Sequence, residues 1–175
     1  LFGLDIEQGS YATSYIPTTD TIATRIYDNI KNINTSSLIG QNEGTFYFEL
    51  DVVDYANSGS PVLYYINNNS STNLTYAQLN EAGFVEFVSP NYYLYWGGLT
   101  NGKHKIAVAH TTGDAVLYVD GVKKDFKSYA DASNVYDIFG LGYTNPSFIG
   151  KTFFGNIMFL PERISDIELE QLTTL

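Results

Sequence analysis

The sequence predicts an all-β protein, a jelly-roll sandwich of two antiparallel sheets with a short helix near its C-terminal end. Apolar residues alternate with polar ones in short runs along the chain, which is the two-residue period of a half-buried strand. Clusters of Gly, Asn, Ser and Pro separate the runs. Tyr and Phe, which favour strands, number 15 and 11, against one Trp. About eleven such strands are typical of an antiparallel sandwich.

The amino-acid composition limits which binding partners and which catalytic chemistry the protein can have. The 175 residues suit one domain with its own core, and the absence of cysteine excludes disulfides, zinc-thiolate sites and thiol catalysis. With 19 acidic and 9 basic residues, the net charge is −10. No stripe of Lys or Arg is present to neutralise phosphates, so neither nucleic acid nor an anionic membrane is an expected partner. No apolar run approaches the roughly 18 residues that span a bilayer.

The N-terminal part is expected to divide from the sandwich near residue 30. Residues 1–30 are interpreted as a strand (1–6) and a Thr-rich connector (18–25), the end of a preceding module, and residues 31–175 as the sandwich. The first clear strand covers residues 44–52. Its period of two places Phe46, Phe48, Leu50 and Val52 on one face, and Tyr47, Glu49 and Asp51 on the other.

Four shorter strands are predicted next, at residues 62–66, 74–79, 84–88 and 92–96, each bounded by turn residues. In the last of them, alternation sends Tyr93 and Tyr95 to one face. Tyr92, Leu94 and Trp96 go to the other face. One of the two sets is expected to lie in the core.

The second half of the chain is predicted to continue in hairpins. Strands at residues 104–109 and 115–119 flank a Gly113 turn, and Asp120-Gly121 is typical of a type I′ turn leading to a solvated strand at 123–127. Residues 136–143 form another strand, in which Gly140 and Gly142 suggest a bulge.

The C-terminal segment changes from strand to helix period. Residues 153–160 are predicted as a strand with Gly155, Ile157 and Phe159 on one face. A helix over residues 166–172 follows, because Ser165 and Glu168 have the spacing of a capping box. Ile164 and Leu169 stand where a hydrophobic staple would place them.

Three motifs resemble one family. Residues 8–18 (QGSYATSYIPT), the strand from His104 followed by LYVDG at 117–121, and ISDIE at 164–168 resemble the concanavalin A-like (laminin-G-like) sandwich modules of phage tail and bacterial surface proteins. The resemblance covers nearly the whole chain. It implies a non-catalytic carbohydrate-binding or adhesion module at a virion tail or cell surface, attached to neighbouring modules and displayed as a homotrimer. The alternative is a structural spacer or decoration domain that contacts other virion proteins.

Carbohydrate binding needs an aromatic ring to stack on a sugar, together with amides or carboxylates for its hydroxyls. Two regions offer this combination. The candidate ligand-binding residues are Tyr64, Tyr65, Asn67 and Asn68 in the first region, and Tyr93, Tyr95, Trp96 and Asn101 in the second.

Catalysis and metal binding are the remaining alternatives. Glu49, Asp51 and Asp54 resemble the Glu-x-Asp-x-x-Glu strand of laminarinase-like glucanases, in which paired carboxylates cleave a glycosidic bond, but the last residue here is Asp. No catalytic residue is therefore assigned. His104 and His110 lie about 20 Å apart on a straight strand and cannot chelate together. No cofactor is expected, with calcium as a candidate at five loop carboxylates: Asp51, Asp54, Asp114, Asp131 and Asp137.

Overall fold

The computed structural model describes residues 30–33, 35–53, 62–68, 74–80, 82–128, 136–141 and 152–175. The strand and connector expected at residues 1–6 and 18–25, and the motif at residues 8–18, lie outside this part of the chain. Among the described residues, no helix has the length and apolar character needed to cross a membrane.

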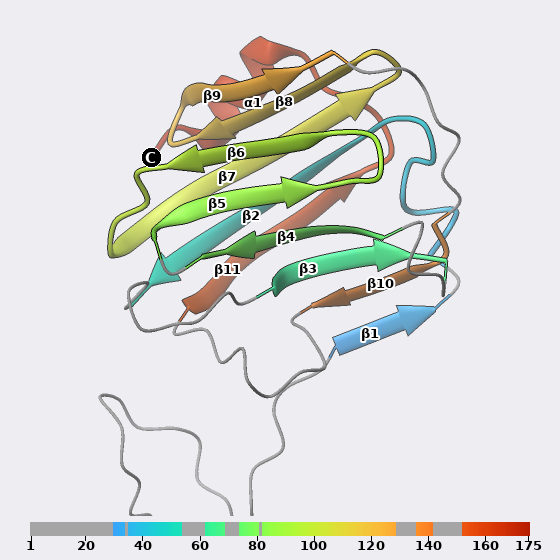
Figure 1. Ribbon diagram of the computed structural model, residues 1–175, viewed down its shortest axis with the longest axis horizontal. Coiled ribbons are helices and arrows are strands. Elements are labelled where there is room, and N and C mark those ends of the chain that lie inside the picture. Colours follow the sequence, from blue (N-terminus) through green and yellow to red (C-terminus); the bar gives the residue numbers. More distant parts are fainter. Residues whose placement is uncertain are drawn as a thin grey trace, which may run out of the picture.

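The described residues form two antiparallel sheets and one helix (Figure 1). Sheet A has the order β1 (Ile30–Ile33), β10 (Ile138–Leu141), β3 (Val62–Asn67), β4 (Thr75–Leu79), β5 (Phe84–Val88) and β6 (Tyr93–Gly97). Sheet B has the order β11 (Thr152–Leu160), β2 (Gly44–Val52), β7 (Gly102–Thr111), β8 (Asp114–Val119) and β9 (Val122–Lys127). Helix α1 (Asp166–Thr173) follows β11. The predicted all-β sandwich of two antiparallel sheets with a short C-terminal helix is confirmed.

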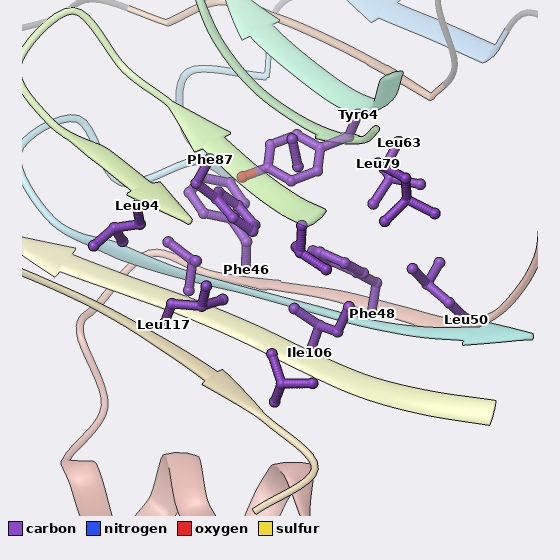
Figure 2. Close-up of a cluster of buried hydrophobic side chains, with 14 of the residues drawn as sticks. Phe46, Phe48, Leu50, Leu63, Tyr64, Leu79, Phe87, Leu94, Ile106 and Leu117 are labelled. Atoms are coloured by element: carbon purple, nitrogen blue, oxygen red, sulfur yellow. The ribbon is translucent and has the colours of Figure 1, made fainter. Parts of the chain in front are cut away.

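The core lies between the two sheets, and aromatic rings dominate its centre (Figure 2). Strand β2 contributes its predicted face, with Phe46, Phe48, Leu50 and Val52 all buried. Sheet A contributes Tyr64 and other apolar side chains to the core. The rings of Tyr64 and Phe46 stack with centroids 5.1 Å apart. Burial of large apolar and aromatic side chains is the main driving force that holds the sheets together.

A second apolar cluster covers the outer face of sheet B. Leu169 and Leu172 of α1 pack there against Tyr118, Tyr47 and smaller residues of β7 and β8. This helix explains why Tyr47, on the polar-looking face of β2, is buried.

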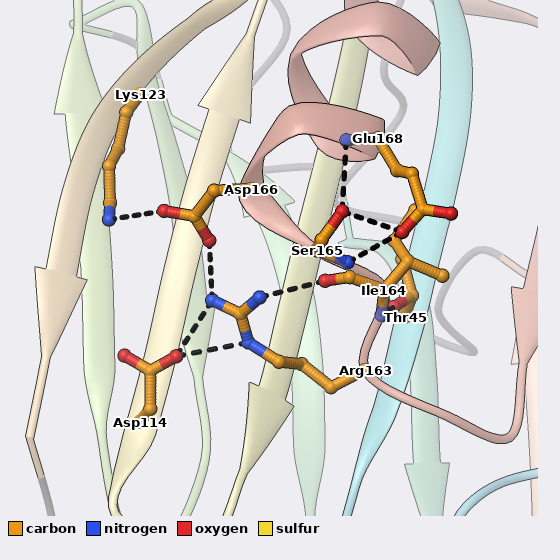
Figure 3. Close-up of polar contacts among 8 residues, drawn as sticks. All are labelled: Thr45, Asp114, Lys123, Arg163, Ile164, Ser165, Asp166 and Glu168. Carbon is orange, nitrogen blue, oxygen red and sulfur yellow. Dashed lines mark hydrogen bonds and ion pairs between the residues drawn. The ribbon is translucent and has the colours of Figure 1, made fainter.

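The predicted cap holds the start of α1 (Figure 3). The Ser165 hydroxyl accepts from the Glu168 N–H at 3.3 Å, and the Ser165 N–H donates to the Glu168 carboxylate at 2.9 Å. Ile164 and Leu169 belong to the same apolar cluster, as a hydrophobic staple requires. The type I′ turn is also confirmed, since Asp120 and Gly121 have φ of 51° and 75°.

Gly140 does not mark a bulge, contrary to the prediction. Strand β10 pairs in continuous register with both β1 and β3 over Ile138–Leu141. The glycine instead makes room for the Tyr65 ring, because a Cβ at Gly140 would lie 2.4 Å from that ring. Glycine is therefore required at position 140 because a side chain of the neighbouring strand approaches the backbone closely there. Gly142 lies outside the described residues.

The shared face predicted for Gly155, Ile157 and Phe159 is also corrected. A register shift between Phe154 and Ile157 interrupts the pairing of β11 with β2. Ile157 and Phe159 pack against the core, whereas a Cβ at Gly155 would lie 2.8 Å from the carboxylate of Glu49 on the opposite face of sheet B. One inserted residue changes which side of the sheet a position faces.

Candidate functional site

The outer face of sheet A at β4, β5 and β6 exposes aromatic rings beside polar side chains. Tyr93 and Tyr95 of β6 are 42% and 48% exposed, and their rings stack with centroids 5.6 Å apart and planes 25° apart. The ring of Phe84, on β5, lies 6.1 Å from that of Tyr95. We call this surface the tyrosine face, defined by Gln78, Asn80, Phe84, Glu86, Tyr93 and Tyr95.

Strand register brings these side chains together. Glu86 of β5 is opposite Gln78 of β4 on one side and Tyr95 of β6 on the other. Val85 and Phe87, which alternate with Glu86, are fully buried in the core. Directly paired side chains of adjacent strands lie on the same face, so the polar and aromatic groups occupy one continuous surface.

Glu86 is the polar centre of the tyrosine face. Its carboxylate accepts from the side-chain amides of Gln78 at 2.5 Å and Asn80 at 2.7 Å. The Tyr93 hydroxyl also donates to it, and burial together with this hydrogen bond and the negative charge of Glu86 raises the pKa of Tyr93 to about 12. The phenol is therefore neutral at physiological pH and remains a donor.

Asn80 fixes the turn that orients Glu86. Its side-chain oxygen accepts from the N–H groups of Ala82 and Phe84, both at 3.0 Å, while its amide nitrogen donates to Glu86. Gly83 takes φ of 75° in this turn, which favours glycine. The turn thus holds an amide next to the carboxylate before any ligand arrives.

The free edge of β6 is tied to the edge strand of the other sheet. The Tyr95 N–H donates to the Asp125 carboxylate of β9 at 3.1 Å, and the Lys124 ammonium lies 4.6 Å from the centre of the Trp96 ring. Strands β6 and β9 contact each other at this margin of the sandwich, near its top in Figure 1. These contacts hold the strand that carries Tyr93 and Tyr95.

Of the second predicted group, the structure supports the two tyrosines as exposed and separates the other members. Trp96 points to the opposite side of β6, packs against the core and stacks with Lys124. Asn101 is exposed but precedes β7 in sheet B. The alternation grouped Tyr92 and Leu94 on one face without deciding which face is the core, and the structure shows that both are buried.

The first predicted group does not form a surface with the second. Tyr64 is only 2% exposed and lies in the core, so it cannot stack on a ligand, and we remove it from the candidate site. Tyr65 is buried against Gly140. Asn67 and Asn68 lie at the end of β3, which β4 and β5 separate from β6. The side-chain oxygen of Asn68 is buried rather than presented to solvent.

Four members of the tyrosine face were not among the candidate binding residues predicted from the sequence: Gln78, Asn80, Phe84 and Glu86. A signal was present, because Glu86 is a charged residue in the middle of an otherwise apolar strand. The short Ser89–Tyr92 turn, closed by a hydrogen bond from Ser89 N–H to Tyr92 O at 2.9 Å, also sets the register of β5 against β6. Counting residues along both strands from that turn pairs Glu86 with Tyr95.

Glu49 of β2 lacks the raised pKa of a general acid. Glu49 accepts from the Tyr47 hydroxyl at 2.7 Å and from the backbone and side chain of Asn156, and these contacts lower its pKa. A general acid for glycoside cleavage needs a raised pKa. Asp54, the third position of the resemblance, lies outside the described residues.

The histidines have structural partners. His104 Nδ1 lies 2.8 Å from the Asp120 carboxylate and its Nε2 lies 2.9 Å from the Thr100 carbonyl. His110 is buried, with its ring parallel to that of Phe46.

No three His, Asp or Glu side chains gather as a metal site in the part of the chain that is described. Of the calcium candidates, Asp114 is paired with Arg163 at 2.8 Å, and Asp54 and Asp131 are outside that part.

Comparison with known proteins gives a fold likeness. No protein-family model and no curated protein matches the chain. Among solved structures, the chain resembles the CBM40 module of a Ruminococcus gnavus IT-sialidase bound to α2,3-sialyllactose, with a TM-score of 0.60 and 17% identity; the match covers 78% of this chain and 84% of that one. It also resembles part of a leech intramolecular trans-sialidase (0.61, 18%) and part of the botulinum neurotoxin serotype G binding domain (0.66, 10%).

The extent of these matches limits what they show. The chain spans about a quarter of the leech enzyme, covering 23% of its length, and 39% of the neurotoxin binding domain. The TM-scores of 0.60 to 0.66 show a shared β-sandwich fold, and identities of only 10% to 18% extend the likeness no further than the fold. The same fold serves many unrelated functions, so the function has to be argued from the site.

Proposed function

We propose that this chain is a non-catalytic carbohydrate-binding module and that the tyrosine face is its binding site. The observation that carries the proposal is the exposed Tyr93–Tyr95 stack beside the Glu86 carboxylate and its two amide partners. Aromatic rings supply a flat surface for the apolar face of a sugar, and the polar groups supply hydrogen bonds for its hydroxyls. The fold likeness to carbohydrate-binding modules supports the same class.

The binding mode is preformed. The tyrosine face sits on three consecutive strands, and Glu86 and Asn80 are already held by hydrogen bonds, so little ordering is required when a ligand binds. A single shallow site of this kind is expected to bind weakly. Display on a homotrimer would raise the overall affinity through a high effective concentration.

A surface or secreted location, in a phage tail fibre or a bacterial adhesin, suits this function and is part of the proposal. In that setting residues 1–30 would end the preceding module of a longer chain. No cofactor is required, because the proposed contacts are made by side chains alone.

The test compares ring-deletion variants in a glycan-array or cell-binding assay. We expect Tyr95→Ala and Tyr93→Ala each to weaken binding by about tenfold, which is the effect of losing one stacked ring and its buried area. The matched control is Phe126→Ala, because Phe126 is 62% exposed but lies on β9, outside the tyrosine face. Binding should also persist in EDTA. Full binding by both tyrosine variants would place the site elsewhere.

One observation favours the second candidate function, a spacer or decoration domain that makes protein contacts. Val122 and Phe126 expose apolar side chains on β9, which is the edge strand of sheet B. Edge strands with exposed apolar groups are prone to pair with other chains. Sedimentation of the same Phe126→Ala protein tests this candidate, since a change in assembly state with unchanged glycan binding would assign β9 to assembly.

A further inference from the structure

The tyrosine face carries a single formal charge, and that charge is negative. Strands β4, β5 and β6 contain no Lys or Arg, and Glu86 is their one carboxylate. The adjoining edge strand β9 carries three lysines, each with a partner of its own. Lys123 pairs with Asp166, Lys124 stacks on Trp96, and Lys127 pairs with Asp125.

Three side chains of the tyrosine face donate hydrogen bonds to one acceptor, the Glu86 carboxylate. Gln78, Asn80 and Tyr93 each donate to Glu86. A carboxylate has about four acceptor sites, so about one remains for a ligand. A sugar hydroxyl can donate to that site. An anionic sugar acid would bring a second carboxylate to it, and two carboxylates cannot bond to each other without a proton or a cation between them.

We propose that the tyrosine face selects uncharged glycans and discriminates against sugars that carry a carboxylate, sialic acid included. The ligand stacks the apolar side of a neutral ring on Tyr93 and Tyr95 and donates a hydroxyl to Glu86. The inference rests on the proposed function, because it names the ligand class of the same site. It also separates this chain from the fold relative that was solved with sialyllactose.

The experiment uses the full chain on an array in which each oligosaccharide is printed with and without its terminal sialic acid, lactose and 3′-sialyllactose among them. Neutral glucan and mannan oligosaccharides complete the set. Among the bound glycans, we expect each neutral form to bind about tenfold better than its sialylated partner. The ratio should increase at low ionic strength, because salt screens the repulsion from Glu86.

A pair of charge variants tests whether Glu86 is the cause. Glu86→Gln keeps the size of the side chain and removes its charge, so the ratio of neutral to sialylated binding should fall toward one. Glu162→Gln removes the same charge from an exposed residue that follows β11, outside the tyrosine face, and should leave the ratio unchanged. Circular dichroism is used to check that both variants are folded. If a variant fails to fold, the ratio of neutral to sialylated binding by the wild-type protein still tests the selectivity.

The outcomes separate the two claims. Equal or better binding of the sialylated forms by the wild type overturns the selectivity and leaves carbohydrate binding intact. An unchanged ratio in a folded Glu86→Gln protein overturns the role of Glu86. The absence of binding to every glycan on the array overturns the proposed function itself.

Discussion

At the scale of single residues, burial constrains the charge state of His110. Its ring is buried beside those of Phe46 and Tyr92, with both centroids 6.0 Å away. Desolvation lowers its pKa from 6.5 to about 4. Protonation in the folded state would therefore place a charge among aromatic rings.

This burial makes stability depend on pH in a defined direction. Between pH 4 and 6.5 the unfolded chain binds a proton at His110 that the folded chain does not. The contribution is fully present above pH 6.5 and is lost as the pH falls toward 4, by up to about 3 kcal/mol. Urea unfolding of the wild type and of His110→Leu across this range measures it. A pH dependence identical in the two proteins would contradict the assignment.

Alternation predicted that Tyr93 and Tyr95 share one face of β6 and that Leu94 lies on the other, which the structure confirms, but it did not say which face is buried. Alternation could not show whether Tyr64 or Tyr65 faces the core, because the two are neighbours on one strand and either could do so. The structure buries both, because Tyr65 covers Gly140 on the neighbouring strand. Glu86 was not predicted as a site residue, because its role depends on partners from two other strands. The strand register determines which residues these partners are.

At the scale of elements, α1 is held by contacts that differ in kind from those of the sheets. Arg163 bonds the carboxylates of Asp114 and Asp166, and Lys123 reaches Asp166 from β9 (Figure 3). Although burial opposes it, these hydrogen bonds lower the pKa of Asp166 to about 2. The network joins the helix start to β8 and β9.

The capping box gives a stability prediction that is independent of ligand binding. Ser165→Ala removes the acceptor of the Glu168 N–H and should reduce the free energy of unfolding by about 1 kcal/mol. Thermal or denaturant unfolding measures the loss. Since α1 covers sheet B and the tyrosine face belongs to sheet A, glycan affinity should be unchanged. A loss of affinity in the folded variant would show that the two sheets are coupled.

Elements with strong local signals were predicted closely, and those shaped by neighbours were not. The 84–88 strand and the capped helix follow from patterns within a few residues. The bulge in β11 and the continuous register of β10 depend on strands far away in sequence. Local periodicity carries no information on such pairings.

At the scale of the whole molecule, the two sheets differ in what covers their outer faces. Sheet B is covered by α1 and its apolar cluster. On sheet A, β4 to β6 expose Tyr93 and Tyr95. The sandwich class followed from composition and alternation. The strand order did not, because β10 inserts between β1 and β3, and β11 joins β2, through long-range connections.

The central claim, that glycans bind on the outer face of sheet A, is tested most directly by backbone NMR during a titration with a neutral oligosaccharide that binds on the array. The account predicts that the largest shift changes fall on residues 78–86 and 93–95. Changes concentrated instead around Glu49 and Asp51, or on α1, would contradict it.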